Sequence, residues 1–213
     1  AGWAAEEVVS DGTTGFHAAR FRNTKSDEYV LAFAGTQPLS KADWVTNFKQ
    51  GLGLKAEQYE TAMQMALNLK QQLGEDGSAR LRFAGHSLGG GLASAAALAT
   101  GIEAVTFNAA GIHKNTKMPD GKPLDLTTAD SPITAYRVSG KIPILNIPVY
   151  LDPLSLLQAG ASPKGLVGNI PDFFKVLTGN TGRLERIFLK PTAKNWTFPH
   201  GMAAVLEAGN WNH

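Results

Sequence analysis

The sequence of 213 residues contains no cysteine, which excludes disulfide bonds and cysteine-ligated metal sites. It also lacks an apolar run of about 18 residues, the length that marks a transmembrane helix. There is little excess charge of either sign, because 20 Lys and Arg residues and 18 Asp and Glu residues give a net charge of +2. No run of like charges marks a nucleic-acid-binding segment. We therefore expect no nucleic-acid partner and no transmembrane segment.

The first residues, AGWAAEEVVSDG, have neither the basic region nor the apolar region of a signal peptide, so none is expected in this sequence. The chain starts at Ala1 rather than Met, as a mature form or an excised domain would. Hydrophobic residues make up 43% and charged residues 18%, which is typical of a globular protein. The length suits a single domain over 1–213.

Strand-like and helix-like segments alternate along the chain. We predict strands at 16–22, 28–34, 79–85, 103–107, 133–138 and 186–190, and helices at 55–73 and 88–100. The first two strands flank the polar connector NTKSD and predict a hairpin. The later strand–helix–strand unit predicts a right-handed crossover and a parallel pair. The fold class is therefore α/β, with a mostly parallel central sheet and helices on both faces.

One serine stands between glycines at the junction of a predicted strand and a predicted helix. Residues 85–89, GHSLG, match the G-x-S-x-G pattern of a nucleophile elbow, a tight turn that exposes the serine above the sheet. Side chains at the two glycine positions would collide with neighbouring backbone. The GGG run lacks the Lys-Ser/Thr of a phosphate-binding loop, and a simple helix cap is the remaining alternative. We predict that Ser87 is a nucleophile.

A serine nucleophile needs a general base and an acid that orients it. In folds with a nucleophile elbow of this kind, the three residues follow one another in the chain as Ser, then Asp or Glu, then His. The chain has five histidines: His17, His86, His113, His200 and His213. His200, in FPHGM near the end of the chain, has the position that the order requires. His17 precedes the motif, and His113 follows it by only one strand. We predict that His200 is the base.

The carboxylate that orients the base is harder to assign. Asp152, in YLDPLSLLQ, is the favoured candidate, although an Asp before Pro is also common at a helix N-terminus. Asp172 is the second candidate. Asp120 lies in a turn sequence, PDGK. No His, Asp or Glu cluster has ligand spacing, so we expect neither a metal nor a cofactor.

Three separated stretches resemble class 3 lipases: YVLAFAGTQPLSKADWVTN, FAGHSLGGGLA and EAVTFNAAG, within residues 28–112. GHSLGGGLASAAALATG together with TFNAAG is similar to bacterial phospholipase A1-like members. The resemblance implies an α/β-hydrolase fold and an oxyanion hole formed by the backbone N–H groups of Thr36 and Leu88. It also implies that Asp43 and Trp44 hold the oxyanion loop or the base of a lid.

The resemblance implies a serine lipid-ester hydrolase, phospholipase A1-like, with Ser87 as its nucleophile; the chain order adds Asp152 and His200 as the rest of the triad. A neutral-lipid lipase, a carboxylesterase and a non-catalytic binding module of the same fold are the alternatives. Residues 141–183 are apolar but interrupted by prolines, which fits a lid, an acyl groove or irregular core. Related lipases include exported proteins and antibacterial effectors. The expected partners are therefore an acyl ester, a transient membrane surface and, for an exported toxin, a neutralising immunity protein.

Overall fold

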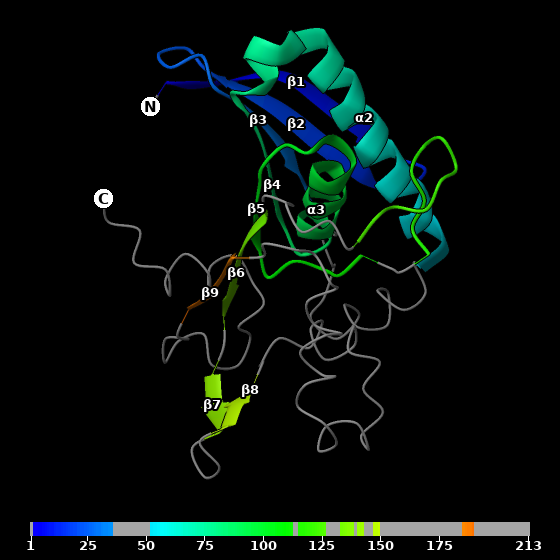
Figure 1. The fold of residues 1–213 in the computed structure, drawn as a ribbon, viewed down its shortest axis with the longest axis vertical. Helices are drawn as coiled ribbons and strands as arrows, with labels where there is room; N and C mark the ends of the chain where they lie inside the picture. The colour runs from blue at the N-terminus through cyan, green and yellow to red at the C-terminus, as the bar shows by residue number, and fades with distance from the viewer. Residues whose placement is uncertain are drawn as a thin grey trace.

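The computed structural model describes residues 2–35, 52–112, 115–126, 133–138, 140–142, 147–149 and 185–189. A seven-stranded sheet with the order β1-β2-β3-β4-β5-β6-β9 forms its centre (Figure 1). The first three strands pair antiparallel: β1 (Trp3–Asp11), β2 (Phe16–Asn23) and β3 (Tyr29–Phe33). From β3 onward all neighbours are parallel: β4 (Leu81–His86), β5 (Ala104–Phe107), β6 (Ile133–Val138) and β9 (Glu185–Leu189). The predicted α/β class and its mostly parallel sheet are confirmed.

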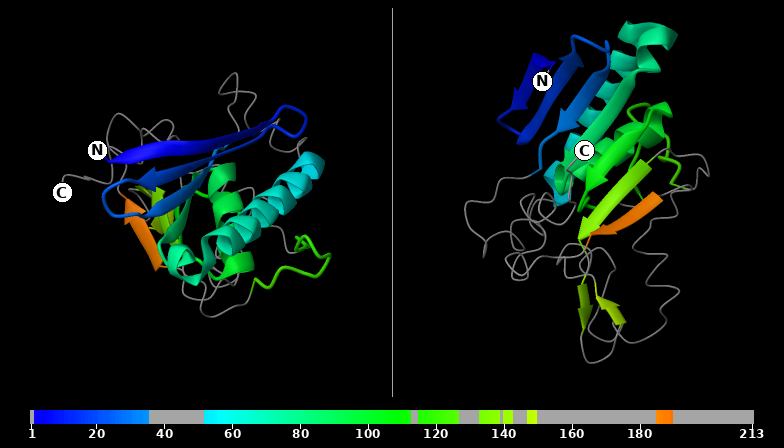
Figure 2. Two further views of the ribbon diagram at one scale, coloured as in Figure 1. Left: turned by 90° about the horizontal axis from the view of Figure 1, so that it is seen from above. Right: turned by 90° about the vertical axis from the view of Figure 1, so that its left-hand side faces the viewer.

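Two helices in the described residues, α2 (Leu52–Ser78) and α3 (Leu88–Thr100), lie together on the same face of the sheet (Figures 1 and 2). The prediction of helices on the second face therefore concerns residues outside the described ones. Gly74 interrupts α2 with φ 65°, so the expected end of the regular helix is confirmed there. Gly101 ends α3 in the left-handed conformation. Neither helix of the described part is long and apolar enough to cross a membrane.

The core lies between these helices and the sheet. Phe16, Phe33 and Phe83 form a row of tilted rings with centroids 6.1 and 6.3 Å apart. Met63 and Ala66 of α2 are fully buried, as the helical spacing predicts. α3 packs close to the sheet because its buried residues are mostly glycine and alanine. This close packing brings the start of α3 against the ends of β3 and β4.

Strand β1 is absent from the sequence-based prediction. Its register with β2 shifts between Ala5 and Glu7, so a β-bulge interrupts the alternation of side chains. Most of its residues are exposed, because β1 is the edge strand. The two-residue period that identifies a half-buried strand is therefore weak here.

A second, two-stranded sheet follows β6 directly. It pairs β7 (Gly140–Ile142) antiparallel with β8 (Ile147–Val149), and in Figure 1 it projects away from the main sheet. Both strands fall within or at the start of the segment expected to form a lid or acyl groove, 141–183. The other residues of that segment lie outside the described ones.

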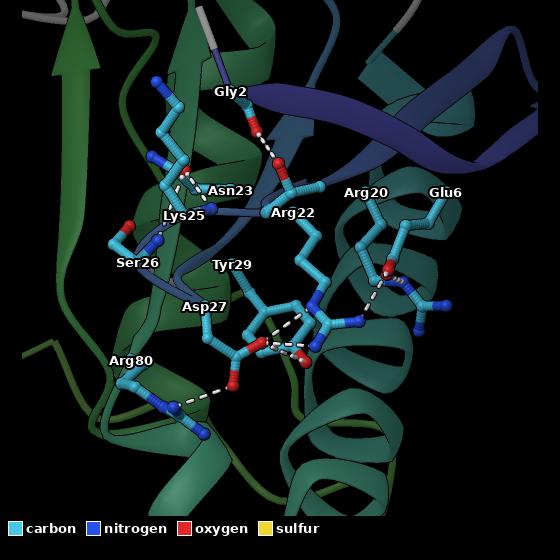
Figure 3. Close-up of polar contacts among 11 residues, drawn as sticks. Gly2, Glu6, Arg20, Arg22, Asn23, Lys25, Ser26, Asp27, Tyr29 and Arg80 are labelled. Carbon is cyan, nitrogen blue, oxygen red and sulfur yellow. Dashed lines mark hydrogen bonds and ion pairs between the residues drawn. The ribbon is translucent and has the colours of Figure 1, made fainter.

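An ion-pair cluster holds the β2–β3 hairpin against the chain that enters β4 (Figure 3). Asp27, in the turn, accepts Nε and Nη2 of Arg22 at 2.7 and 2.5 Å and pairs with Nη1 of Arg80 at 2.7 Å. The hydrogen bond from Arg22 holds the pKa of the Asp27 carboxyl below its usual value. All three side chains are partly exposed, so solvent screens the cluster.

We expect Asp27→Asn to lower the melting temperature at pH 7 and to have a smaller effect at pH 3. The folded-state pKa of Asp27 is depressed, so its contribution is present above the unfolded-state value and disappears as the pH falls through the folded one. Thermal melts of both proteins at the two pH values test this. Asp120→Asn is the matched control, because among the described residues Asp120 pairs locally, with Lys122 at 2.7 Å. An equal loss in both variants would contradict a role for the cluster in joining distant segments.

Candidate active site

Ser87 lies in the turn between β4 and α3, at the carboxyl end of the parallel strands. Its φ of 59° and ψ of −125° place it among the three non-glycine residues with positive φ in the described part of the chain. Such a conformation costs about 1–3 kcal/mol and persists only where the surroundings enforce it. The tight strand-to-helix turn expected from the G-x-S-x-G pattern is therefore present.

Backbone hydrogen bonds enforce this conformation from both sides. The Ser87 N–H donates to the Phe107 carbonyl at 3.1 Å. The Ser87 carbonyl accepts the N–H groups of Ala110, at 2.8 Å, and of Gly91, at 3.2 Å. None of these bonds uses the hydroxyl, and the Ser87 side chain makes no capping bond to α3 within the described residues. The residue is buried, with 4% of its surface exposed, and its backbone is fixed by bonds that do not engage Oγ.

The two motif glycines are required by close backbone contacts. A Cβ atom at Gly85 would overlap the carbonyl group of Gly89, on the first turn of α3. A Cβ atom at Gly89 would overlap the carbonyl oxygen of Phe33, at the end of β3. Any side chain at either position would therefore push α3 away from the sheet and distort the turn that carries Ser87.

The segment after β3 approaches the same serine. A Cβ atom at Gly35 would lie 2.8 Å from the His86 carbonyl oxygen and 3.3 Å from the Ser87 Cβ. Thr36, the next residue, lies outside the described residues. Leu88 is the first residue of α3, where helical N–H groups have no intrahelical acceptor and the helix dipole is positive. The first turn of α3 contains no acidic residue that would oppose a developing negative charge.

The remaining predicted site residues cannot be located in the described part. His200, Asp152, Asp172, Asp43 and Trp44 all lie outside it. Strands β6 and β9 are parallel to β4, so their carboxyl ends lie at the same end of the sheet as Ser87. Asp152 follows β6 in the chain, and His200 follows β9.

Asn108 is a structural feature of the site that the sequence reasoning missed. It follows β5 with φ 42°, is 1% exposed, and donates its N–H to the Tyr136 carbonyl at 2.9 Å. This left-handed residue turns the chain so that Ala110 reaches the Ser87 carbonyl. Asparagine tolerates this conformation better than most residues do. Its presence in the stretch TFNAAG is the one sequence signal that could have indicated this turn. Within the described residues, no group of three His, Asp or Glu side chains could hold a metal ion.

Comparison with known proteins identifies the family of the chain. The model of a phospholipase-like family, the Tle-like phospholipase domain, matches residues 3–170. The chain belongs to this family. The extracellular phospholipase A1 of Serratia liquefaciens is 48% identical to the chain over 108 residues, which are 51% of this chain and 31% of that protein. The chain thus covers about a third of the length of that relative.

Two solved lipases of low sequence identity are similar to this Tle-like family member over part of its chain. The Lip2 lipase of Yarrowia lipolytica is 17% identical, with a TM-score of 0.45 over 68% of this chain and 62% of that chain. The native Rhizomucor miehei lipase propeptide complex is 15% identical, with a TM-score of 0.43 over 64% of this chain and 50% of that chain. The family match and the Serratia relative confirm the predicted resemblance to phospholipase A1-like proteins.

Proposed function

We propose that this member of the Tle-like phospholipase family is a serine hydrolase that removes the sn-1 acyl chain of phospholipids. The observation that carries the proposal is the strained backbone of Ser87, held by three backbone hydrogen bonds at the strand-to-helix turn. Strain of this kind is retained where it serves a site. The 48% identity to an extracellular phospholipase A1 over 108 residues supports the choice of substrate and an exported protein.

In the proposed mechanism, Ser87 Oγ attacks the ester carbonyl carbon while His200 removes its proton. The N–H groups of Leu88 and Thr36 stabilise the negative oxygen of the tetrahedral intermediate. His200 then returns the proton to the leaving lysophospholipid oxygen, and the C–O ester bond breaks. Water, deprotonated by His200, hydrolyses the acyl-enzyme, releases the fatty acid and restores the Ser87 hydroxyl. Asp152 holds the His200 ring in the required tautomer throughout.

The apolar segment 141–183 would contact the acyl chains. Its first part, β7, begins two residues after β6 ends, at the edge of the sheet that carries Ser87. The apolar composition of the segment would suit the acyl tails of a substrate or the surface of a bilayer.

A diacyl phospholipid with two distinguishable chains tests the substrate and the bond that is cleaved. We expect the protein to release the sn-1 chain, with slower release from triacylglycerol and short-chain esters. Faster turnover of triacylglycerol would replace the proposal by a neutral-lipid lipase, and preference for short esters by a carboxylesterase. If a folded protein cleaved none of these substrates, a binding module without activity would be the better account.

The assignment of the triad acid is tested by Asp152→Asn. Loss of the carboxylate leaves the base in the wrong tautomer, which lowers kcat by a factor of about 10⁴ in enzymes with this triad. Asp172→Asn is the matched control and should retain activity within about twofold of wild type, because it is outside the proposed triad. Steady-state phospholipid hydrolysis measures both. The reverse pattern would move the acid to Asp172.

A further inference from the structure

Tyr59 is a buried tyrosine of α2 whose hydroxyl reaches the chain beyond β5. Its side chain is 6% exposed, and its Oη donates a hydrogen bond to the Gly111 carbonyl at 3.1 Å. Burial raises the pKa of the Tyr59 hydroxyl, so the group remains a protonated donor at physiological pH. Tyr59 lies within the helix predicted at 55–73, and the structure makes it part of the core. A core position does not by itself require the hydroxyl.

The same hydroxyl lies against the third glycine of the GGG run, which the G-x-S-x-G pattern does not require. A Cβ atom at Gly91 would overlap the Tyr59 Oη and lie 2.9 Å from the Ala110 carbonyl oxygen. Tyr59 therefore fits between α3 and the segment 108–111. Glycine at 91 leaves the space that the phenol oxygen occupies.

The segment held by Tyr59 also holds the proposed nucleophile. Ala110, the neighbour of Gly111, donates its N–H to the Ser87 carbonyl at 2.8 Å. Phe107, just before this segment, accepts the Ser87 N–H at 3.1 Å. A shift of the Gly111 carbonyl would thus be transmitted through one residue to the strained backbone of Ser87.

We propose that Tyr59 is a positioning residue, whose hydroxyl fixes the segment 108–111 and thereby keeps Ser87 in its strained conformation. This inference rests on the proposed function, because it assigns Tyr59 a role in the reaction of Ser87. Tyr59 does not contact the substrate or donate to the reacting atoms. It acts through the hydrogen bond between Ala110 and Ser87, and small displacements of a nucleophile are costly for the rate.

The hydroxyl is tested by Tyr59→Phe, which keeps the ring in the core. We expect kcat for phospholipid to fall about tenfold while KM changes by less than about twofold, because attack is impaired and binding is not. Leu69→Ala, another buried position of α2, is the matched control for stability. It should lower the melting temperature at least as much as Tyr59→Phe yet leave kcat unchanged at 25 °C. Unchanged kcat in Tyr59→Phe, or an equal loss in Leu69→Ala, would overturn the proposal.

A second pair of variants tests the fit between Tyr59 and Gly91. Gly91→Ala should lose more activity than Tyr59→Phe, since its Cβ overlaps the phenol oxygen. The double variant Tyr59→Phe/Gly91→Ala lacks that oxygen and should be several-fold more active than Gly91→Ala alone. The rescue is partial because the Ala110 carbonyl still lies 2.9 Å from the new Cβ position. Independent, multiplicative losses would contradict the proposed contact.

Hydrogen exchange separates failure of this inference from failure of the proposed function. The Ala110 amide should exchange faster in Tyr59→Phe than in wild type, while the Gly101 amide, bonded to the Ala97 carbonyl at 2.8 Å, should be unaffected. This comparison needs no substrate. If wild type cleaves no ester, the proposed function fails and exchange alone decides whether Tyr59 holds the segment. Equal exchange at Ala110 would overturn the positioning role.

Discussion

Ser87→Ala is expected to lower kcat for phospholipid hydrolysis by a factor of about 10⁶ while the protein remains folded. The loss is large because removal of the nucleophile closes the covalent route, and the base and acid cannot act without it. The fold should survive because the three hydrogen bonds of Ser87 all use its backbone. The side chain makes no capping bond to α3 within the described residues, so none is lost.

Release of fatty acid and a thermal melt measure the two halves of this expectation. Ser94→Ala is the matched control, because Ser94 lies within α3 and, among the described residues, its hydroxyl bonds the Gly90 carbonyl of the same helix at 2.9 Å. It should keep wild-type activity. If Ser87→Ala were about as active as wild type, Ser87 would not be the nucleophile. If Ser87→Ala lost its cooperative unfolding transition, the loss of activity would say nothing about chemistry, and the argument that the side chain is not needed for folding would be wrong.

Gly89→Ala is expected to have the largest effect on stability, with a loss of about 3 kcal/mol or more in the free energy of unfolding. The new Cβ would overlap the carbonyl oxygen of Phe33. Both groups belong to regular elements, α3 and β3, so neither can move without disturbing the packing between helix and sheet. Hydrolysis should be lost as well, because the first turn of α3 carries the proposed oxyanion donor at Leu88.

Gly101→Ala is the control that separates steric overlap from backbone strain. Gly101 has φ 75°, but a Cβ atom there would meet nothing within 4 Å. Only the left-handed conformation is penalised, at about 1 kcal/mol. Urea denaturation of both variants measures the difference. Losses of equal size would show that the contact between Gly89 and Phe33 is not tight.

Local patterns predicted the elements that carry the site. The strand before Ser87, the helix at 88–100 with its end at Gly101, and the strands at 133–138 and 186–190 all agree with the structure within one or two residues. Each of these elements has a period or an end signal within its own sequence. Strand β1 has neither, because its bulge disrupts the alternation and its edge position leaves most of its residues exposed.

The sequence by itself determined the nucleophile motif, the parallel strand–helix–strand unit and the resemblance to lipases. These depend on residues within a few positions of one another, where backbone sterics and helical period act directly. Only the tertiary structure decided that Gly35 meets Ser87, that Asn108 turns in the left-handed region and that the Tyr59 hydroxyl reaches Gly111. Such contacts join segments far apart in the chain, and no local pattern encodes the distance between two segments until the core has packed them together.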